Sequence, residues 1–177
     1  MDEADIKMVK EGEGFKMETN PNFDWQGWYT TNWPDTRMPE ILDCIRSIRQ
    51  NHSWIASVGY CWGGLVNFKL ASKDVVDCIT IAHPGGPTED EVKAIKIPVQ
   101  IIAPEHDPTF SQEMKDFCNK EILKLGVDYI YHHFPGMLHG FTTKCDETNP
   151  HEKKQLETAK NAVVFWLVNH APEAGAK

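Results

Sequence analysis

Hydrophobic residues along this chain follow two patterns that alternate from about residue 37 to the C-terminus. Short continuous apolar runs are typical of strands buried on both faces, whereas apolar residues at helical spacing are typical of helices. The apolar runs predict strands at 54–58, 77–82, 97–103 and 127–134. The stretches around them predict helices at about 37–50, 65–73, 89–96, 111–125 and from residue 150 onward. Because strands and helices alternate, the sequence predicts a three-layer α/β/α fold, in which helices cover both faces of a mostly parallel sheet.

The N-terminal part of the chain divides into two segments. Residues 1–22 show no sustained periodicity and are expected to be poorly structured, so the folded domain is predicted to span residues 23–177. Five aromatic residues then crowd into positions 23–33, which predicts a loop or short helix that covers another part of the molecule. This segment is either a hydrophobic plug on the core or an aromatic wall of a substrate pocket, with Trp28 as a candidate wall residue.

One cysteine lies between the first predicted strand and the next helix, framed by glycines. Gly59, Cys61 and Gly63 form the pattern G-x-C-x-G, which is the nucleophile-elbow pattern with sulfur in place of oxygen. Glycines are expected where a strand turns sharply into a helix, because side chains there would collide. The helix that follows points its N-terminus at the cysteine, and its dipole favours the thiolate. The sequence therefore predicts a strained, exposed and reactive thiol at Cys61.

Polar residues also follow the other three predicted strands. His83, Asp107 and His139 come just after the second, third and fourth strands, and the carboxyl ends of parallel strands meet at the edge where ligands bind. The chain order cysteine, aspartate, histidine is the order of the nucleophile, acid and histidine in α/β-hydrolases. We therefore predict that Cys61 is a nucleophile, that His139 moves the proton and that Asp107 orients His139. The backbone N–H of Trp62 is the expected oxyanion donor, and His83 is expected to support the site.

Composition narrows the function classes. The chain has 177 residues and a net charge of −8, which argues against nucleic-acid partners and anionic membrane surfaces. No apolar run approaches the roughly 20 residues that span a bilayer, and the polar N-terminus does not resemble a signal peptide. Five cysteines without a C-x-x-C pair favour the cytoplasm and argue against zinc. Three of these cysteines are expected in the core: Cys44, Cys78 and Cys118.

Three motifs together resemble the dienelactone hydrolase family, especially its fungal branch, from about residue 23 to the C-terminus. These motifs are Gly59-Tyr60-Cys61-Trp62-Gly63-Gly64, Glu105-His106-Asp107 and His139-Gly140-Phe141. The resemblance implies an α/β-hydrolase fold, a Cys-His-Asp triad, no cofactor, and hydrolysis of small lactones or esters. It assigns the nucleophile to Cys61, the acid to Asp107 and the general base to His139. The candidate pocket residues beside them are Tyr60, His83, Trp28 and Phe141.

One departure from the family pattern concerns the N-terminal side. Family members carry a section that contributes the first strands of the sheet, whereas only about 50 residues precede the first predicted strand here. The resemblance therefore implies a fold truncated by loss of those N-terminal strands, with activity that is weak unless another segment supplies the second oxyanion donor. The strand before Cys61 should then lie at the edge of the sheet, where unpaired backbone groups invite pairing. We expect either a homodimer that covers this edge or docking of segment 23–33 over it.

Three function hypotheses from different classes follow from the sequence. The first is a cysteine-dependent hydrolase of small esters or lactones. The second is a degenerate family member that acts as a binding or assembly partner. The third is a non-hydrolytic enzyme of a biosynthetic pathway that uses the same pocket for cyclisation or isomerisation.

Overall fold

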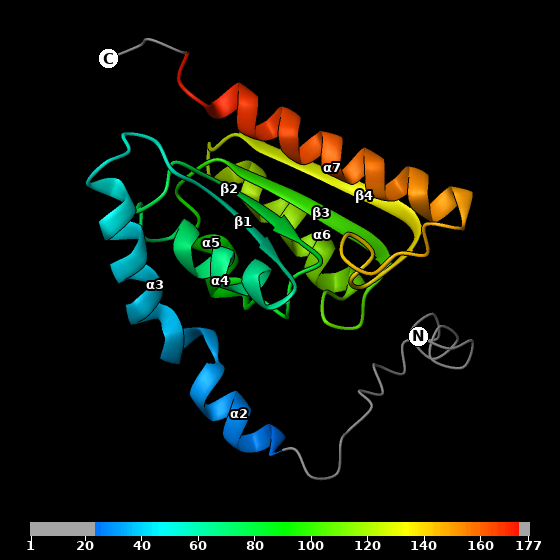
Figure 1. Ribbon diagram of the computed structural model, residues 1–177, viewed down its shortest axis with the longest axis horizontal. Coiled ribbons are helices and arrows are strands. Elements are labelled where there is room, and N and C mark those ends of the chain that lie inside the picture. The colour runs from blue at the N-terminus through cyan, green and yellow to red at the C-terminus, as the bar shows by residue number, and fades with distance from the viewer. Residues whose placement is uncertain (1–23, 174–177) are drawn as a thin grey trace.

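A computed structural model describes residues 24–173 and contains a sheet of four parallel strands (Figure 1). The strands lie side by side in chain order, so each connection crosses from one strand to its neighbour. Their bounds are β1 Ala56–Tyr60, β2 Cys78–Ala82, β3 Val99–His106 and β4 Tyr129–Leu138. The predicted strands are therefore confirmed, with β1, β3 and β4 extending further toward the carboxyl edge than the apolar runs indicated. The predicted boundary at residues 22 and 23 lies outside the described residues.

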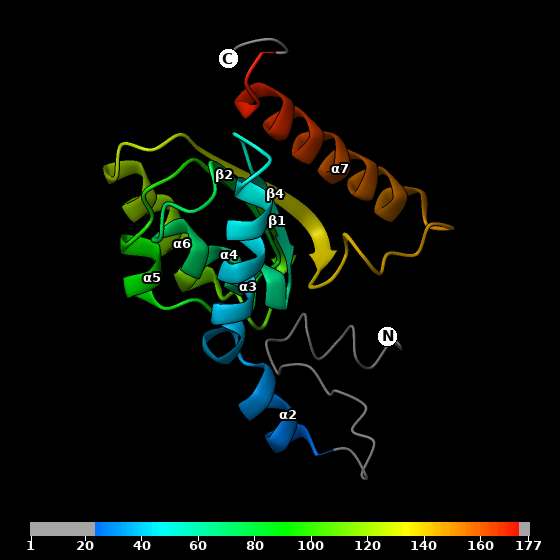
Figure 2. The ribbon, with the colours of Figure 1, turned by 60° about the vertical axis from the view of Figure 1, so that its left-hand side comes forward.

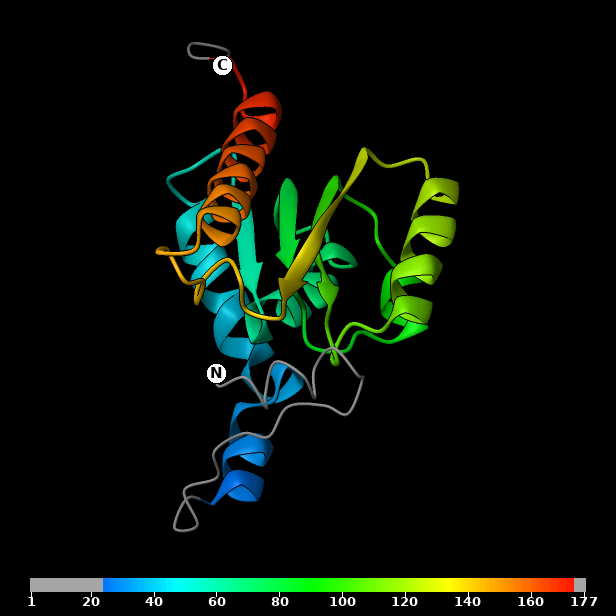
Figure 3. The same cartoon turned by 90° about the vertical axis from the view of Figure 1, so that its right-hand side faces the viewer.

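Helices cover both faces of the sheet (Figures 2 and 3). Helices α3 to α6 lie on one face, and α7 covers the other (Figure 2). This arrangement confirms the predicted three-layer α/β/α fold. None of the described helices combines the length and the apolar character needed to cross a membrane. The helices are α2 Trp25–Asn32, α3 Pro34–Arg49, α4 Trp62–Ala71, α5 Glu89–Lys93, α6 Gln112–Glu121, the short 3-10 helix η1 Ile122–Lys124, and α7 Pro150–His170.

Hydrophobic packing on the two faces is unequal. The larger cluster joins the sheet to α3–α6 and includes Phe68, Ile79 and Ile101, all fully buried. The smaller cluster packs Ile102 and other residues near the carboxyl edge against α7. Because β2 is covered on both sides, every one of its residues is buried, which explains its continuous apolar sequence.

The aromatic segment does not take the place expected for it. Within the described residues it forms α2, which extends away from the sheet and leaves β1 uncovered (Figures 1 and 2). Trp28 and Trp33 are 38% and 42% exposed. The indole N–H of Trp62 donates to the carbonyl oxygen of Asn32 at 2.9 Å, which ties the end of α2 to the start of α4. The described part of the segment is therefore neither a plug on the core nor a cover for the sheet edge.

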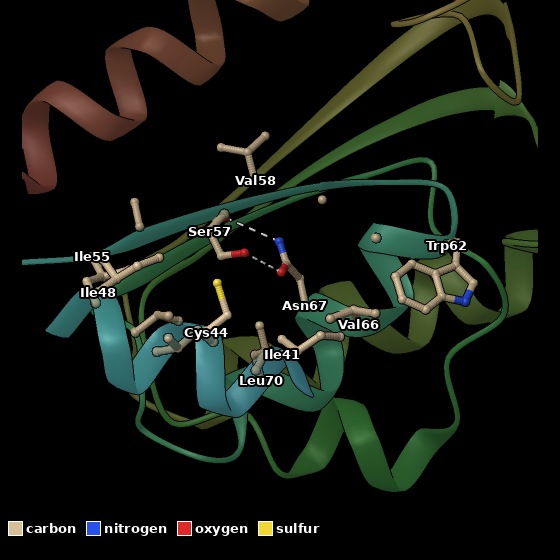
Figure 4. Close-up of a pocket in the computed structure, with 15 residues that line it drawn as sticks. Ile41, Cys44, Ile48, Ile55, Ser57, Val58, Trp62, Val66, Asn67 and Leu70 are labelled. Carbon is tan, nitrogen blue, oxygen red and sulfur yellow. Dashed lines mark hydrogen bonds between the residues drawn. The ribbon is translucent and has the colours of Figure 1, made fainter. Parts of the chain in front are cut away.

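Strand β1 lies at the edge of the sheet, as predicted, because its neighbour among the described strands is β2 alone. Beside it, an apolar groove of about 340 Å³ runs between α3, β1 and α4 (Figure 4). Cys44 lines this groove and is exposed, so the expectation that it lies in the core is wrong, whereas Cys78 and Cys118 are buried. At the floor of the groove, buried Asn67 donates to the carbonyl oxygens of Ser57 and Thr80 and so fastens α4 to β1 and β2.

The open edge of β1 has backbone groups available for pairing. The carbonyl of Ile55 and the N–H of Cys61 bond to the β2 side. Backbone groups alternate along a strand, so those of Ala56, Val58 and Tyr60 face away from β2. Strand β1 contains no proline and no charged residue to protect this edge.

We therefore predict that the chain forms a homodimer through β1, which light scattering after size-exclusion chromatography would detect as twice 20.2 kDa. Val58→Pro should return the chain to a monomer, because it removes an outward N–H and breaks no bond to β2. A wild-type chain that stays monomeric at every concentration would contradict the prediction.

Candidate active site

The turn between β1 and α4 holds Cys61 in an unusual backbone conformation. Cys61 has φ 52° and ψ −112°, a region that residues with side chains rarely adopt. A Cβ atom on Gly59 would lie 2.1 Å from the carbonyl oxygen of Gly63, so only glycine fits at position 59. A Cβ atom on Gly63 would meet no atom of the described chain within 4 Å, whereas one on Gly64 would lie 3.0 Å from Pro84. The predicted steric role therefore holds for Gly59 but belongs to Gly64 rather than to Gly63.

The structure brings together the three residues that the sequence predicted at the carboxyl edge. The Nε2 atom of His139 lies 3.1 Å from the Sγ atom of Cys61. The Nδ1 atom of the same ring lies 3.0 Å from both carboxylate oxygens of Asp107. The side chain of Asp107 is fully buried, that of His139 is 11% exposed, and Cys61 is exposed. The three groups thus form a chain of contacts that begins in the interior and ends at an accessible sulfur.

Thr109 holds the aspartate and was not singled out from the sequence. Its backbone N–H donates to Oδ1 of Asp107 at 2.9 Å, and its hydroxyl lies 2.8 Å from the same oxygen. The N–H of Phe110 also donates to that oxygen. An aspartate that accepts from the N–H two residues further on is a common turn, so the spacing Asp107-Pro108-Thr109 carried a signal for this role.

Hydrogen bonding among Cys61, His139 and Asp107 favours an ion pair between a Cys61 thiolate and a protonated His139. The hydrogen bond with His139 lowers the pKa of the Cys61 thiol below its usual value, against the opposing effect of burial. Burial disfavours the charged imidazole, but hydrogen bonds to Asp107 and Cys61 outweigh it and raise the pKa of His139 to about 9. The buried thiols behave in the opposite way, because burial raises the pKa of Cys78 to about 11 and that of Cys118 to about 12. Cys61 is therefore a thiol whose surroundings favour the thiolate.

The N-terminus of α4 adds to this effect. Cys61 is the N-cap residue of α4, and within the described chain no side chain caps the helix there. The backbone N–H of Trp62 lies close enough to the sulfur to lower the pKa of the thiol further. Backbone N–H groups at the start of a helix stabilise a bound anion, and here the Trp62 N–H can stabilise the thiolate in the same way.

The remaining candidate residues fall in different surroundings. Tyr60 is 41% exposed beside the cysteine, whereas His83 is fully buried, with its ring centroid 5.0 Å from that of His139. Phe141 is 4% exposed and packs in the smaller core cluster, so it lies beneath the site rather than at its surface. Trp28 lies on α2, beside Tyr29, and is not brought to the Cys61–His139–Asp107 contacts.

Across residues 24–173, no group of three or more histidine, cysteine or acidic residues is arranged to hold a metal ion.

Comparisons with known proteins agree with this architecture. A model of the dienelactone hydrolase family matches residues 27–171. The chain is 27% identical to the hydrolase pyvD of Aspergillus violaceofuscus, over 89% of this chain and 65% of that protein. It is 25% identical to dienlactone hydrolase 1 of Gibberella moniliformis, over 84% of this chain and 59% of that protein. It therefore spans about two thirds or less of the length of these two relatives.

A solved structure shares the fold. It is that of a dienelactone hydrolase-like promiscuous phosphotriesterase from metagenomic libraries, with a TM-score of 0.63 and 19% sequence identity. The match covers 82% of this chain and 65% of that one.

The two glycines of the turn give a matched pair of substitutions. Gly59→Ala should destabilise the fold by about 1–3 kcal/mol or prevent folding, because its new carbon would press on the Gly63 carbonyl. Gly63→Ala should leave stability unchanged or slightly raised, because the space is open and alanine suits a helix better than glycine. Urea unfolding measures both variants, and equal losses would contradict this account of the turn.

The reactivity of Cys61 with iodoacetamide should depend on pH through its lowered pKa. The thiolate is the reactive form, so the reaction should stay fast to a lower pH than for an ordinary cysteine, whose pKa is about 8.5, and slow as pH falls through the thiol pKa. His139→Ala should move this profile to higher pH, because the largest lowering effect is lost. The rates are best measured with Cys44 and Cys145 replaced by alanine, and an unmoved profile would contradict the ion pair.

Proposed function

The chain belongs to the dienelactone hydrolase family, and from that premise we propose that it hydrolyses small lactones or esters through Cys61, His139 and Asp107. The observation that carries this proposal is the pair of contacts on one imidazole. Its Nε2 faces the Cys61 sulfur at 3.1 Å, and its Nδ1 faces the Asp107 carboxylate at 3.0 Å. Such a constellation is recognised by its geometry and roles on any fold.

The first half of the proposed reaction forms a thioester. The Cys61 thiolate attacks the acyl carbon of the substrate, and negative charge develops on the carbonyl oxygen. The Trp62 N–H is the donor that the proposal assigns to this oxygen. Protonated His139 then gives its proton to the leaving alkoxide as the carbon–oxygen bond breaks, which leaves the acyl group on sulfur and the imidazole neutral.

The second half releases the acid. Neutral His139 takes a proton from a water molecule, and the resulting hydroxide attacks the thioester carbon. The carbon–sulfur bond breaks, and the electron pair returns to Cys61 as thiolate. Asp107 keeps Nδ1 protonated throughout, so that Nε2 stays directed at the sulfur and at the water. The raised pKa of His139, about 9, favours the starting ion pair at neutral pH.

The experiment that tests the proposal is hydrolysis of an activated aryl acetate. Cys61→Ala and His139→Ala should each lower the rate by at least about 100-fold, because each removes a group that takes part in bond breaking. Mass spectrometry of the quenched wild-type reaction should detect an acetyl group on Cys61. Cys44→Ala is the matched control, because Cys44 is also exposed but lies on α3 in the groove beside β1, and its rate should equal that of the wild type.

Unchanged hydrolysis in both the Cys61 and the His139 variants would overturn the proposal. Binding of an ester without turnover would instead favour a binding role, and a product of unchanged mass would favour isomerisation or cyclisation.

A further inference from the structure

His83 is a buried titratable residue that the proposed reaction does not use. It follows the last residue of β2 and is fully buried. Its backbone φ of 35° lies in the left-handed region, which is unfavourable for a residue other than glycine. Its N–H donates to the carbonyl oxygen of Ile102 at 2.9 Å, so its backbone is fixed to β3.

The side chain of His83 contacts the segment that carries His139. Its Nε2 atom lies 2.6 Å from the hydroxyl oxygen of Thr142. Its ring centroid lies 5.0 Å from that of His139 and 6.1 Å from that of Phe141, both in edge-on arrangements. Three of the four residues in 139–142 therefore meet this one imidazole. The segment has no regular secondary structure, so its position depends on such side-chain contacts together with a few backbone bonds, among them that from the His139 N–H to the His106 carbonyl oxygen at 3.1 Å.

A histidine is an unfavourable choice for packing alone at this position. The Nδ1 atom of His83 is buried and has no hydrogen-bond partner among residues 24–173, and an unpaired buried polar atom is destabilising. An apolar side chain of similar size would avoid that loss. What an apolar side chain cannot supply is the bond between Nε2 and Thr142.

The charge state of His83 suits a place beside a charged imidazole. Burial, followed by the nearby charge of His139, lowers the pKa of His83 to about 4 despite the opposing effect of Asp107. His83 is therefore neutral while His139 is protonated, and the two rings can touch without repulsion between like charges.

We propose that His83 is a positioning residue, which holds the 139–142 segment through Thr142 so that His139 Nε2 stays within hydrogen-bond distance of the Cys61 sulfur. It acts as a further anchor for His139, in addition to Asp107, the Thr109 hydroxyl 3.1 Å from Nδ1 and the bond from the His139 N–H to the His106 carbonyl oxygen. This inference deepens the proposed function, because it concerns the same site. The contact between His139 and Cys61 that it explains does not itself require the chain to hydrolyse an ester.

The test measures the pH profile of Cys61 alkylation by iodoacetamide, which needs no substrate. In the full chain with Cys44 and Cys145 replaced by alanine, Thr142→Val removes the hydroxyl and keeps the shape of the side chain. It should move the profile to higher pH and slow the reaction at pH 7 by about threefold to tenfold, the range expected for one lost hydrogen bond. Thr142→Ser restores a hydroxyl and should restore the profile.

Two further variants separate positioning from a general structural role. His83→Gln can place an amide nitrogen near the position of Nε2 and should keep most of the reactivity, whereas His83→Leu should lose it to the same degree as Thr142→Val. The double variant His83→Leu/Thr142→Val should lose no more than either single variant, because both remove the same contact. Thr158→Val is the matched control, because its hydroxyl bonds within α7 to the Lys154 carbonyl, and its profile should not move.

The outcomes are separable from those of the proposed function. If Thr142→Val and Thr142→Ser both keep the wild-type profile, or both lose it equally, the proposal is overturned. If His83→Leu does not fold, the two Thr142 variants decide the question on their own. A shifted profile in a chain that hydrolyses no ester would support positioning by His83 while contradicting the hydrolase.

Discussion

The parallel pairing of four strands in chain order is the constraint on which the site depends. It ends every strand at one edge, so residues 61, 83, 107 and 139, far apart in sequence, become neighbours there. The contact of His139 with both Cys61 and Asp107 follows from this topology. The tight turn at Gly59 then lifts the sulfur out of the sheet to an exposed position.

The imidazole of His139 connects the buried carboxylate of Asp107 to the exposed residue Cys61. The Asp107 carboxylate is buried and accepts hydrogen bonds from the N–H groups of Thr109 and Phe110, so water does not screen its effect on His139. That charge raises the proton affinity of His139, and the proton on His139 in turn favours the thiolate of Cys61. Buried thiols elsewhere in the same chain lack this support and are held in the protonated form.

Much of this arrangement could be predicted from the sequence, because apolar runs and helical spacing reflect burial directly. The four strands and the meeting of Cys61, Asp107 and His139 follow from that pattern, whereas the edge position of β1 was expected from the family resemblance. The predictions that were wrong concerned features that depend on contacts between segments distant in the sequence. Neighbouring segments decide three of these features: the outward course of α2, the exposure of Cys44, and the greater need for glycine at position 64 than at position 63. A single sequence carries no direct signal of such neighbours.

Locally destabilising features, namely strained backbone and a buried charged residue, lie near the carboxyl edge of the sheet. Their positions support a functional role for this edge. Among residues 24–173, three residues other than glycine have positive φ, and two of them, Cys61 and His83, lie at this edge. Buried Lys115 adds a third feature, because it donates to the carbonyl oxygens of Pro104 and Glu105 just where β3 becomes irregular before Asp107. Strain and buried polar groups reduce stability, so they persist where the surrounding structure fixes them. Here Cys61 and His83 both lie beside His139, and Lys115 fixes the end of β3 that leads into Asp107.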